Sequence, residues 1–518
     1  MEHPRNDHND VTPRFRQGSV FRASMGDAPT LAGFVAEFDG SRFRLPLNVR
    51  ETLELWLARA AASLRVFADL RVVSPYDIPA RWQILLSYLF LNKLIERPNF
   101  DVVSWRNDLP PLYVVSLRHV FDSKQTSGRQ VVITGQGRSR NPEDAYGKAI
   151  GELLERQSLT IYRDTELVRG TYDGLCAARQ KPLNVERLNH FLPWQQSQNP
   201  LLVFHGKSEL AWARGMELLS GTRALIPAQY ALWNYRLLPG EPVLVNMTSN
   251  GAGAFFSYHE AVLSGLYEAV ERDAFVMYWL NTIAPPVLDT ASFPQGSVAH
   301  EILAQCTRYG IEVYFLDTTG DIAIPTCACV LVDRRGNGSR VAVGAAGGFD
   351  TEKNLWASYS EALSIANAAA GFSEYQLPPG YEPFSPCVFI GKPERWGYWK
   401  NADSAQRIAG FISGATIDAM QSAFYSTART FVSVAEEYDH ALELFRAKGE
   451  GYEVYCYRAS RPVLTRLGYV AVKITVPKLF PLYLEERLAT LDSPRLREFA
   501  SRHGQGEAQP NPIPHPFI

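Results

Sequence analysis

The sequence lacks the long apolar runs that membrane proteins carry. Its longest such run, WQILLSYLFL at Trp82–Leu91, has about half of the roughly 20 residues that a membrane-spanning helix needs. The first 25 residues are polar and contain no apolar core of a secretory signal. We therefore expect neither membrane insertion nor secretion, and the cytoplasm is the expected compartment.

The sequence also has few cysteines and almost no net charge. Six cysteines in 518 residues are too few for a disulfide framework. The 52 basic and 54 acidic residues nearly cancel, so no overall charge draws the chain to nucleic acid or to a membrane. Only Cys327 and Cys329 are close in sequence, and the surrounding IPTCACVLVD predicts a buried strand rather than a metal site.

Common catalytic motifs are absent as well. The sequence contains no GxxxxGK[ST] phosphate loop, no kinase HRD and DFG pair, no zinc finger, and neither HExxH nor GxSxG. Its ten histidines form no spaced pair, so a lone histidine such as His119 or His205 is expected to be an ordinary part of the fold.

What remains is the composition of an ordinary globular protein, 46% hydrophobic and 20% charged, long enough for about three domains. Residues 1–28 are expected to be disordered. Residues 29–111 predict a small module of two strands and two helices, either a winged-helix-like peptide binder or a plain scaffold. Residues 112–508 alternate strands and helices as one large mixed α/β unit, and residues 509–518 form a proline-rich tail.

One structural plan is used twice in the large unit. VVITGQG, residues 131–137, predicts a strand that runs into a glycine turn, and a helix follows with Asn141 as its N-cap and Pro142 in its first turn. EPVLVNMTSNGAGAF, residues 241–255, predicts a strand and a turn at Gly251 and Gly253 before a helix over 257–280. Further strands are predicted at 311–317, 328–333, 452–457 and 469–476, with a helix over 351–369.

Both predicted helices carry the pattern E-x-x-E-R, which places two carboxylates on one helix face. The flanking residues are apolar, and burying such charges without partners is costly. Mg²⁺, which prefers oxygen ligands, is one suitable partner, and structural ion pairs are the alternative. Likewise, each glycine turn could cradle phosphate or be simply a tight turn. The carboxylates concerned are Glu152 with Glu155, Glu268 with Glu271, and the interior-looking Glu361.

These segments together resemble the YcaO superfamily. The similarity follows TGQG…DAYGKAIGELLER, SNGAGAF…EAVERDAF, SEALSIA and VKITVPKLFPL in order, over about 400 residues. The tail PNPIPHPFI is similar to the ending of the azoline-forming members, the D proteins of azole-containing peptide biosynthesis.

The resemblance implies an ATP-dependent cyclodehydratase that acts on a ribosomal precursor peptide. In that family a Cys, Ser or Thr side chain attacks the preceding amide carbonyl, and ATP turns the amide oxygen into a phosphate leaving group. The family's Mg²⁺ ligands correspond to Glu152, Glu155, Glu268, Glu271 and Glu361. Its nucleotide contacts correspond to Gly135, Gln136, Gly137, Arg156, Ser249, Gly251 and Arg272. Its tail residues correspond to Pro512, Pro514, His515, Pro516 and Ile518, of which His515 or the terminal carboxylate could assist proton transfer.

The sequence departs from the family at two cations. Many relatives have lysine where this chain has Gln136, and often arginine where it has Ala357. Arg138, Arg140 or Arg156 would then have to balance the phosphate charge.

The resemblance also implies partners and leaves two alternatives. We expect no fused ubiquitin-activating-enzyme-like domain of the kind that some relatives carry in front, so a separate leader-binding C protein and an FMN-dependent dehydrogenase B protein are expected, with a homodimer inside the larger complex. Thioamide or amidine formation is one alternative to azoline formation. A non-catalytic scaffold is the other.

Overall fold

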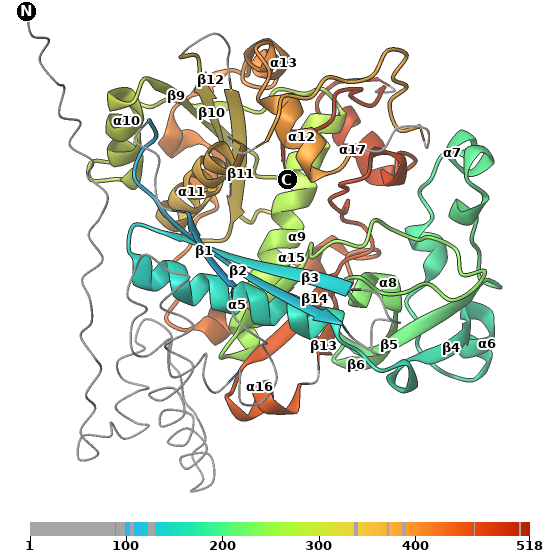
Figure 1. Ribbon diagram of the computed structural model, residues 1–518. Helices are drawn as coiled ribbons and strands as arrows, with labels where there is room; N and C mark the ends of the chain where they lie inside the picture. The colour runs from blue at the N-terminus through green and yellow to red at the C-terminus, as the bar shows by residue number, and fades with distance from the viewer. Residues whose placement is uncertain are drawn as a thin grey trace, which may run out of the picture.

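The computed structural model describes residues 89, 99–103, 108–122, 130–335, 340–369, 372–385, 390–459, 461–506 and 509–517. The predictions for residues 1–28, for most of the module at 29–111 and for Ile518 lie outside these residues. Within them the fold is the expected mixture of helices and strands (Figure 1).

A three-stranded antiparallel sheet begins the described chain. Its strands, in spatial order, are β1 (Asn99–Val103), β2 (Tyr113–Asp122) and β3 (Gln130–Ser139). Helix α5, Pro142–Thr160, packs against β3, and its N-cap is Asn141, whose side chain accepts the Glu143 N–H, with Pro142 in the first turn as predicted. Because β1 pairs with β2, the end of the predicted N-terminal module extends the first sheet of the large unit.

A six-stranded sheet supports the second helix of the repeated plan. The order is β4-β5-β13-β14-β7, with β6 beside β5. Helix α9, Tyr258–Leu280, begins at the N-cap Ser257 and packs against β7 and β14. The strands are β4 (Val168–Thr171), β5 (Glu209–Glu217), β6 (Thr222–Pro227), β7 (Ala252–Phe255), β13 (Tyr455–Ala459) and β14 (Val470–Thr475).

A five-stranded sheet completes the framework in the order β11-β10-β9-β8-β12. Cys327 and Cys329 are fully buried in β10, as their surroundings predicted. Helix α11, Thr351–Ala369, packs on β11 and β10. The strands are β8 (Val287–Leu288), β9 (Ile311–Asp317), β10 (Thr326–Asp333), β11 (Arg340–Gly347) and β12 (Thr416–Ile417).

Shorter helices join and cover these sheets. Among the described residues, no helix is long and apolar enough to cross a bilayer. The other helices are α6 (Tyr172–Ala177), α7 (Pro193–Gln198), α8 (Ala228–Ala231), α10 (Val298–Arg308), α12 (Lys392–Trp399), α13 (Ser404–Ala409), α14 (Ala423–Ser426), α15 (Val434–Lys448), α16 (Pro462–Arg466) and α17 (Pro494–Arg502).

The glycines of GQG lie within a strand, so the predicted turn is wrong. Strand β3 continues through Gly135 and Gly137 to Ser139. A Cβ added at Gly137 would lie 1.7 Å from the carbonyl oxygen of Ala145, and one at Gly135 would lie 2.3 Å from that of Ala149. These glycines therefore let the backbones of β3 and α5 touch.

The strand–glycine–helix plan occurs three times rather than twice. A Cβ at Gly253 in β7 would lie 2.1 Å from the Ala261 carbonyl oxygen on α9. A Cβ at Gly344 in β11 would lie 2.3 Å from the Ser358 carbonyl oxygen on α11. Each of the three sheets thus brings one strand into backbone contact with one helix, and the third occurrence was missed.

The predicted strand at the start of EPVLVNM is also absent. Residues 241–245 have no regular structure, because a side chain satisfies their backbone: Gln229 donates to the Pro242 carbonyl at 2.7 Å and accepts the Leu244 N–H at 2.9 Å. Only Gly251 lies in a turn, with φ of 77°, while Gly253 belongs to β7.

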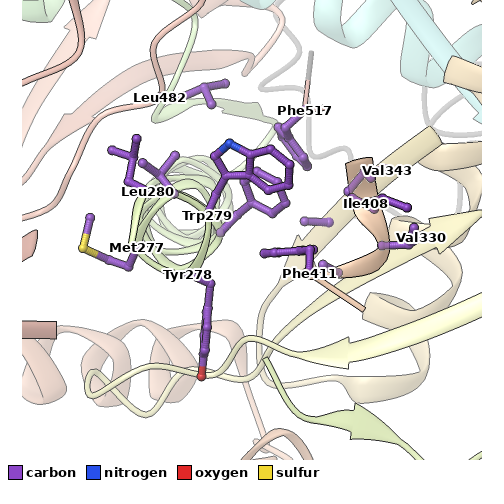
Figure 2. Packing of buried hydrophobic residues seen from close by; sticks show 14 of the residues in the cluster. Met277, Tyr278, Trp279, Leu280, Val330, Val343, Ile408, Phe411, Leu482 and Phe517 are labelled. Carbon is purple, nitrogen blue, oxygen red and sulfur yellow. The ribbon is translucent and has the colours of Figure 1, made fainter. Parts of the chain in front are cut away.

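The proline-rich tail is part of the core. Residues 514–517 are buried, and Phe517 is only 1% exposed. The tail lies in the middle of the molecule beside α9 and α12 (Figure 1). Figure 2 shows Phe517 among the apolar side chains around Trp279 and Phe411.

Candidate functional site

The three repeated units bring three carboxylates to one place. In each unit a backbone N–H at the strand donates to a helix glutamate. The Gln136 N–H donates to Glu152. The Gly251 N–H donates to Glu268 at 3.0 Å, and the Ala345 N–H donates to Glu361 at 3.1 Å. These bonds fix one oxygen of each carboxylate and leave the other for a further partner.

Two more glutamates lie one helical turn beyond the first two. Burial, together with the nearby Glu268 and Glu152, raises the pKa of Glu155 to about 8. Burial also raises the pKa of Glu271 to about 8, with Glu361 and Glu268 adding to the rise against the pull of Arg272. The two carboxyls therefore favour the protonated form until a cation neutralises them.

Arg272 lies at the centre of the glutamates. Its guanidinium is 2.9 Å from Glu271, 3.4 Å from Glu268 and 3.8 Å from Glu361. Burial opposes its charge, but the three carboxylates outweigh burial and hold the pKa of Arg272 above its usual range.

Two further arginines border the cluster. Arg156 contacts Glu152 at 2.8 Å, and Arg138 contacts Glu361 at 3.5 Å. By contrast, Arg140 pairs with Glu301 at 2.9 Å and lies over Trp356, so it does not join the cluster.

Two lysines that the sequence did not single out for this site complete the charged groups. Burial lowers the pKa of Lys473 to about 8 against the pull of Glu268 and Glu155. Lys392 is exposed as a residue, yet the protein around its ammonium desolvates it and lowers its pKa to about 8, and Arg156, Arg272 and Arg138 add to this effect while Glu152 opposes it. Lys473 also lines a recess with Thr248 and Asn250, beside the turn that holds Glu268.

The residues present fit Mg²⁺ and a polyphosphate. Carboxylate oxygens are the ligands that Mg²⁺ prefers. Buried N–H groups of Arg138, Arg156 and Arg272 have no hydrogen-bond partner in the described chain, and such groups suit phosphate oxygens. Among the described residues, no three His, Cys, Asp or Glu side chains form a preformed metal site, so Mg²⁺ bound here would need water and phosphate to complete its coordination.

The tail reaches this cluster. The ring of Phe517 lies 4.0 Å from the Arg272 guanidinium, on which it stacks. Trp279 and Trp399 donate to the carbonyl oxygens of Ile513 and Pro514 at 3.0 and 3.1 Å. The tail is therefore anchored by its backbone and covers one side of Arg272.

His515 is fully buried within the tail. Its Nε2–H donates to the Tyr483 carbonyl oxygen at 2.7 Å, and burial, followed by the nearby Arg395, holds its pKa well below the usual value. Pro512 is exposed, whereas Pro514 and Pro516 are buried. The role of these residues in the reaction stays a prediction, as does that of Ile518.

Comparisons with known proteins identify the family. The model of the YcaO cyclodehydratase family, described as ATP- and Mg²⁺-binding, matches residues 136–480. The chain therefore belongs to the YcaO family, and ATP and Mg²⁺ are the cofactors of that family. The separate roles of the five glutamates and of the tail are not decided by this membership.

Individual relatives are more distant. An uncharacterized protein of the tfuA 3′ region in Rhizobium leguminosarum bv. trifolii is 27% identical over 229 residues, which is 43% of this chain and 50% of that protein. The chain thus spans about half the length of that relative.

Solved structures share the fold. A heterocyclase in complex with substrate and cofactor has a TM-score of 0.63 at 19% identity, covering 82% of this chain and 56% of the other. YcaO from Methanopyrus kandleri, bound with AMPPCP and Mg²⁺, has a TM-score of 0.52 at 18% identity, covering 81% and 92%.

Proposed function

We propose that this protein is the ATP-hydrolysing cyclodehydratase subunit of a peptide-modifying system. A Cys, Ser or Thr side chain of the peptide attacks the preceding amide carbon and loses its proton. The former amide oxygen then leaves as phosphate, and the amide nitrogen loses its proton to form the C=N bond of the azoline ring. When bound, Mg²⁺ and ATP supply the phosphoryl group that makes this oxygen a good leaving group. The balance is one water removed from the peptide and one ATP converted to ADP and phosphate.

One observation supports this proposal most: three glutamates from two helices, Glu268 and Glu271 on α9 and Glu361 on α11, surround Arg272, and the tail covers it. A structural ion pair needs one carboxylate for one guanidinium. Here five glutamates and three arginines share one place, and buried N–H groups of the arginines are unbonded. The glutamates suit a cation such as Mg²⁺, and the arginines suit an anion such as the triphosphate of ATP.

Separate groups of residues in this chain would bind Mg²⁺, bind phosphate and exclude water. Glu152, Glu155, Glu268, Glu271 and Glu361 would hold Mg²⁺, directly or through water. Gly135, Gln136, Gly137, Ser249 and Gly251 form the backbone next to Glu152 and Glu268. The guanidinium groups of Arg156 and Arg272 would bind phosphate oxygens and stabilise the charge that develops during transfer. The buried tail would keep water from the reacting amide.

The substrate and partners follow from the same proposal. The substrate is a ribosomal precursor peptide, presented by a separate leader-binding C protein. A flavin-dependent B protein would oxidise azolines to azoles, and the complex would contain a homodimer of this chain in the cytoplasm.

The test is cyclisation of a precursor peptide encoded beside this gene, with the leader-binding partner present. We expect the peptide to lose one water mass per ring, with one phosphate released for each. Glu268→Gln and Glu271→Gln should each lower the rate by roughly a thousandfold, since each removes a charge from the phosphoryl-transfer site.

A matched control separates charge at the site from charge in general. Glu443→Gln changes an exposed glutamate on α15, whose side chain is 62% exposed, and should cyclise at the parental rate. ATP-dependent incorporation of sulfur or closure by another amide nitrogen would instead identify the thioamide or amidine alternative. Absence of any nucleotide turnover with the complete system would leave the scaffold alternative.

A further inference from the structure

Three successive carbonyl groups of the tail accept hydrogen bonds from side chains of α9 and α12. Because proline has no N–H, a buried proline-rich segment needs partners mainly for its carbonyl oxygens. The three donors therefore suit such a backbone, and we call them the tail seat. Their bonds run from Trp279 to Ile513 at 3.0 Å, from Trp399 to Pro514 at 3.1 Å, and from Arg395 to His515 at 2.9 Å.

Arg395 is the charged member of the tail seat. Its guanidinium also contacts Glu486 at 2.8 Å and donates to the Leu484 carbonyl oxygen at 3.1 Å. Both ions of this pair are buried, Arg395 in α12 and Glu486 in a short turn before α17. A single side chain thus joins α12, the segment before α17 and the tail.

A buried ion pair is by itself a weak source of stability. The cost of removing two charges from water nearly cancels their attraction, and well-packed apolar side chains often serve equally well. A guanidinium, however, has five N–H donors in a rigid fork. It can therefore hold a carboxylate and two carbonyl oxygens at fixed positions, which an apolar side chain cannot do.

The tail seat fixes the position of Phe517, two residues beyond His515. The buried ring of Phe517 lies 4.0 Å from the guanidinium of Arg272. Carboxylates of three glutamates contact the same guanidinium, so the ring is an apolar cover on a charged group. An apolar group in this place keeps water from the site, and its placement depends on the backbone bonds just before it.

We propose that Arg395, held by Glu486, is a positioning residue that keeps the tail in place as a cover against water. This inference rests on the proposed function. Water that reaches the site can accept the phosphoryl group in place of the amide oxygen, which converts ATP and water to ADP and phosphate without forming a ring. The tail seat therefore sets the number of phosphates released for each ring formed.

The test replaces both ions by apolar side chains, Arg395→Met together with Glu486→Met, so that no unpaired charge stays buried. The double variant should unfold close to the parental temperature. With the precursor peptide and the leader-binding partner, it should form rings roughly ten- to a hundredfold more slowly, because the cover is displaced. The ratio of phosphate to rings should rise from about one to several, whereas loss of a purely structural ion pair would leave this ratio unchanged.

Hydrogen exchange tests the tail seat without using activity. In the double variant the amides of residues 513–517 should exchange faster, while those of β14 should keep the parental rate. Trp399→Phe keeps an aromatic ring and removes the N–H that bonds Pro514, so it should show the same changes to a smaller degree. If the double variant does not fold, Trp399→Phe decides by the same two measurements.

The control removes an exposed ion pair, Arg446→Met together with Glu443→Met on α15, and should match the parent in both measurements. Parental exchange of the tail amides in both seat variants would overturn the assignment of Arg395. Faster exchange with a parental ratio of phosphate to rings would overturn the role of the tail as a cover. A folded parent that forms no rings in the complete system would overturn the proposed function, while the exchange rates would still decide whether Arg395 holds the tail.

Discussion

Glu271→Gln distinguishes a ligand-binding carboxylate from a structural ion pair. Glu271 is 8% exposed on α9 and lies 2.9 Å from Arg272. If its purpose is the ion pair, the substitution should destabilise the protein under all conditions. If its purpose is to bind a cation, the protein without ligand should bear the cost of the buried carboxylate, and the substitution should relieve that cost.

The direction and size of the expected change in the free energy of unfolding follow from the pKa of Glu271. Because the pKa of Glu271 rises from 4.5 to about 8 on folding, the folded protein holds more protons than the unfolded chain between these values. The free energy of unfolding therefore falls as pH rises through this range, by about 5 kcal/mol at most for this group. Losing one partner of Arg272 costs about 1–3 kcal/mol, but Glu268 and Glu361 remain beside it. Glu271→Gln should thus stabilise the ligand-free protein by roughly 2–4 kcal/mol near pH 8.5.

The assay is urea unfolding at pH 5.5 and pH 8.5, with and without Mg²⁺·ADP. We expect the gain at pH 8.5 to shrink or reverse at pH 5.5, where the parental carboxyl is protonated. Mg²⁺·ADP should stabilise the parent and have little effect on the variant. Glu155→Gln should show the same pH dependence, whereas Glu443→Gln should show none. Destabilisation of Glu271→Gln by several kcal/mol at both pH values, with ligand stabilisation retained, would refute the reasoning.

Three further changes test other parts of the structure. Truncation after Asn511 removes the buried residues 514–517 and the ring that stacks on Arg272, so it should lower the unfolding temperature and strongly reduce cyclisation, and parental azoline formation by mass spectrometry would contradict a role for the tail. Phe517→Leu should unfold at a lower temperature by calorimetry, because it loses ring packing in the core and the stack on Arg272, at a cost of about 1–3 kcal/mol. Gly137→Ala should be severely destabilising, since its Cβ would lie 1.7 Å from a backbone oxygen, whereas Gly151→Ala on α5 meets nothing within 4 Å and should unfold at or above the parental temperature.

Local patterns predicted the helices that carry the glutamates. The N-cap of α5 at Asn141 was predicted directly, and α9 and α11 lie where helices were predicted over 257–280 and 351–369. The spacing of Glu268 and Glu271 then placed both on one buried face. These features depend on residues within a few turns of one another, so they can be read without the fold.

Features that depend on distant segments were missed. A glycine pair before a helix predicts a turn, whereas Gly135 and Gly137 are required by a helix backbone that passes within reach of the strand. Lys392 lies more than a hundred residues from Arg272, and no local pattern joins them. One signal for the third unit was present: seventeen residues separate Gly135 from Glu152, Gly251 from Glu268, and Gly344 from Glu361.

The repeated spacing explains how the site obtains its charge. Each unit uses a strand from a different sheet, and each delivers one glutamate held by a backbone N–H in the strand or in the turn just before it, so the carboxylates meet only when all three sheets are packed together. Without ligands, the raised pKa values of Glu155 and Glu271 favour their protonated forms. The lowered pKa values of Lys473 and Lys392 make their charged forms less favourable. Mg²⁺ alone would neutralise the glutamates but leave the arginines and lysines without an anion. A triphosphate alone would be repelled by the glutamates. Each ligand therefore improves the site for the other, and by thermodynamic linkage the two effects are equal.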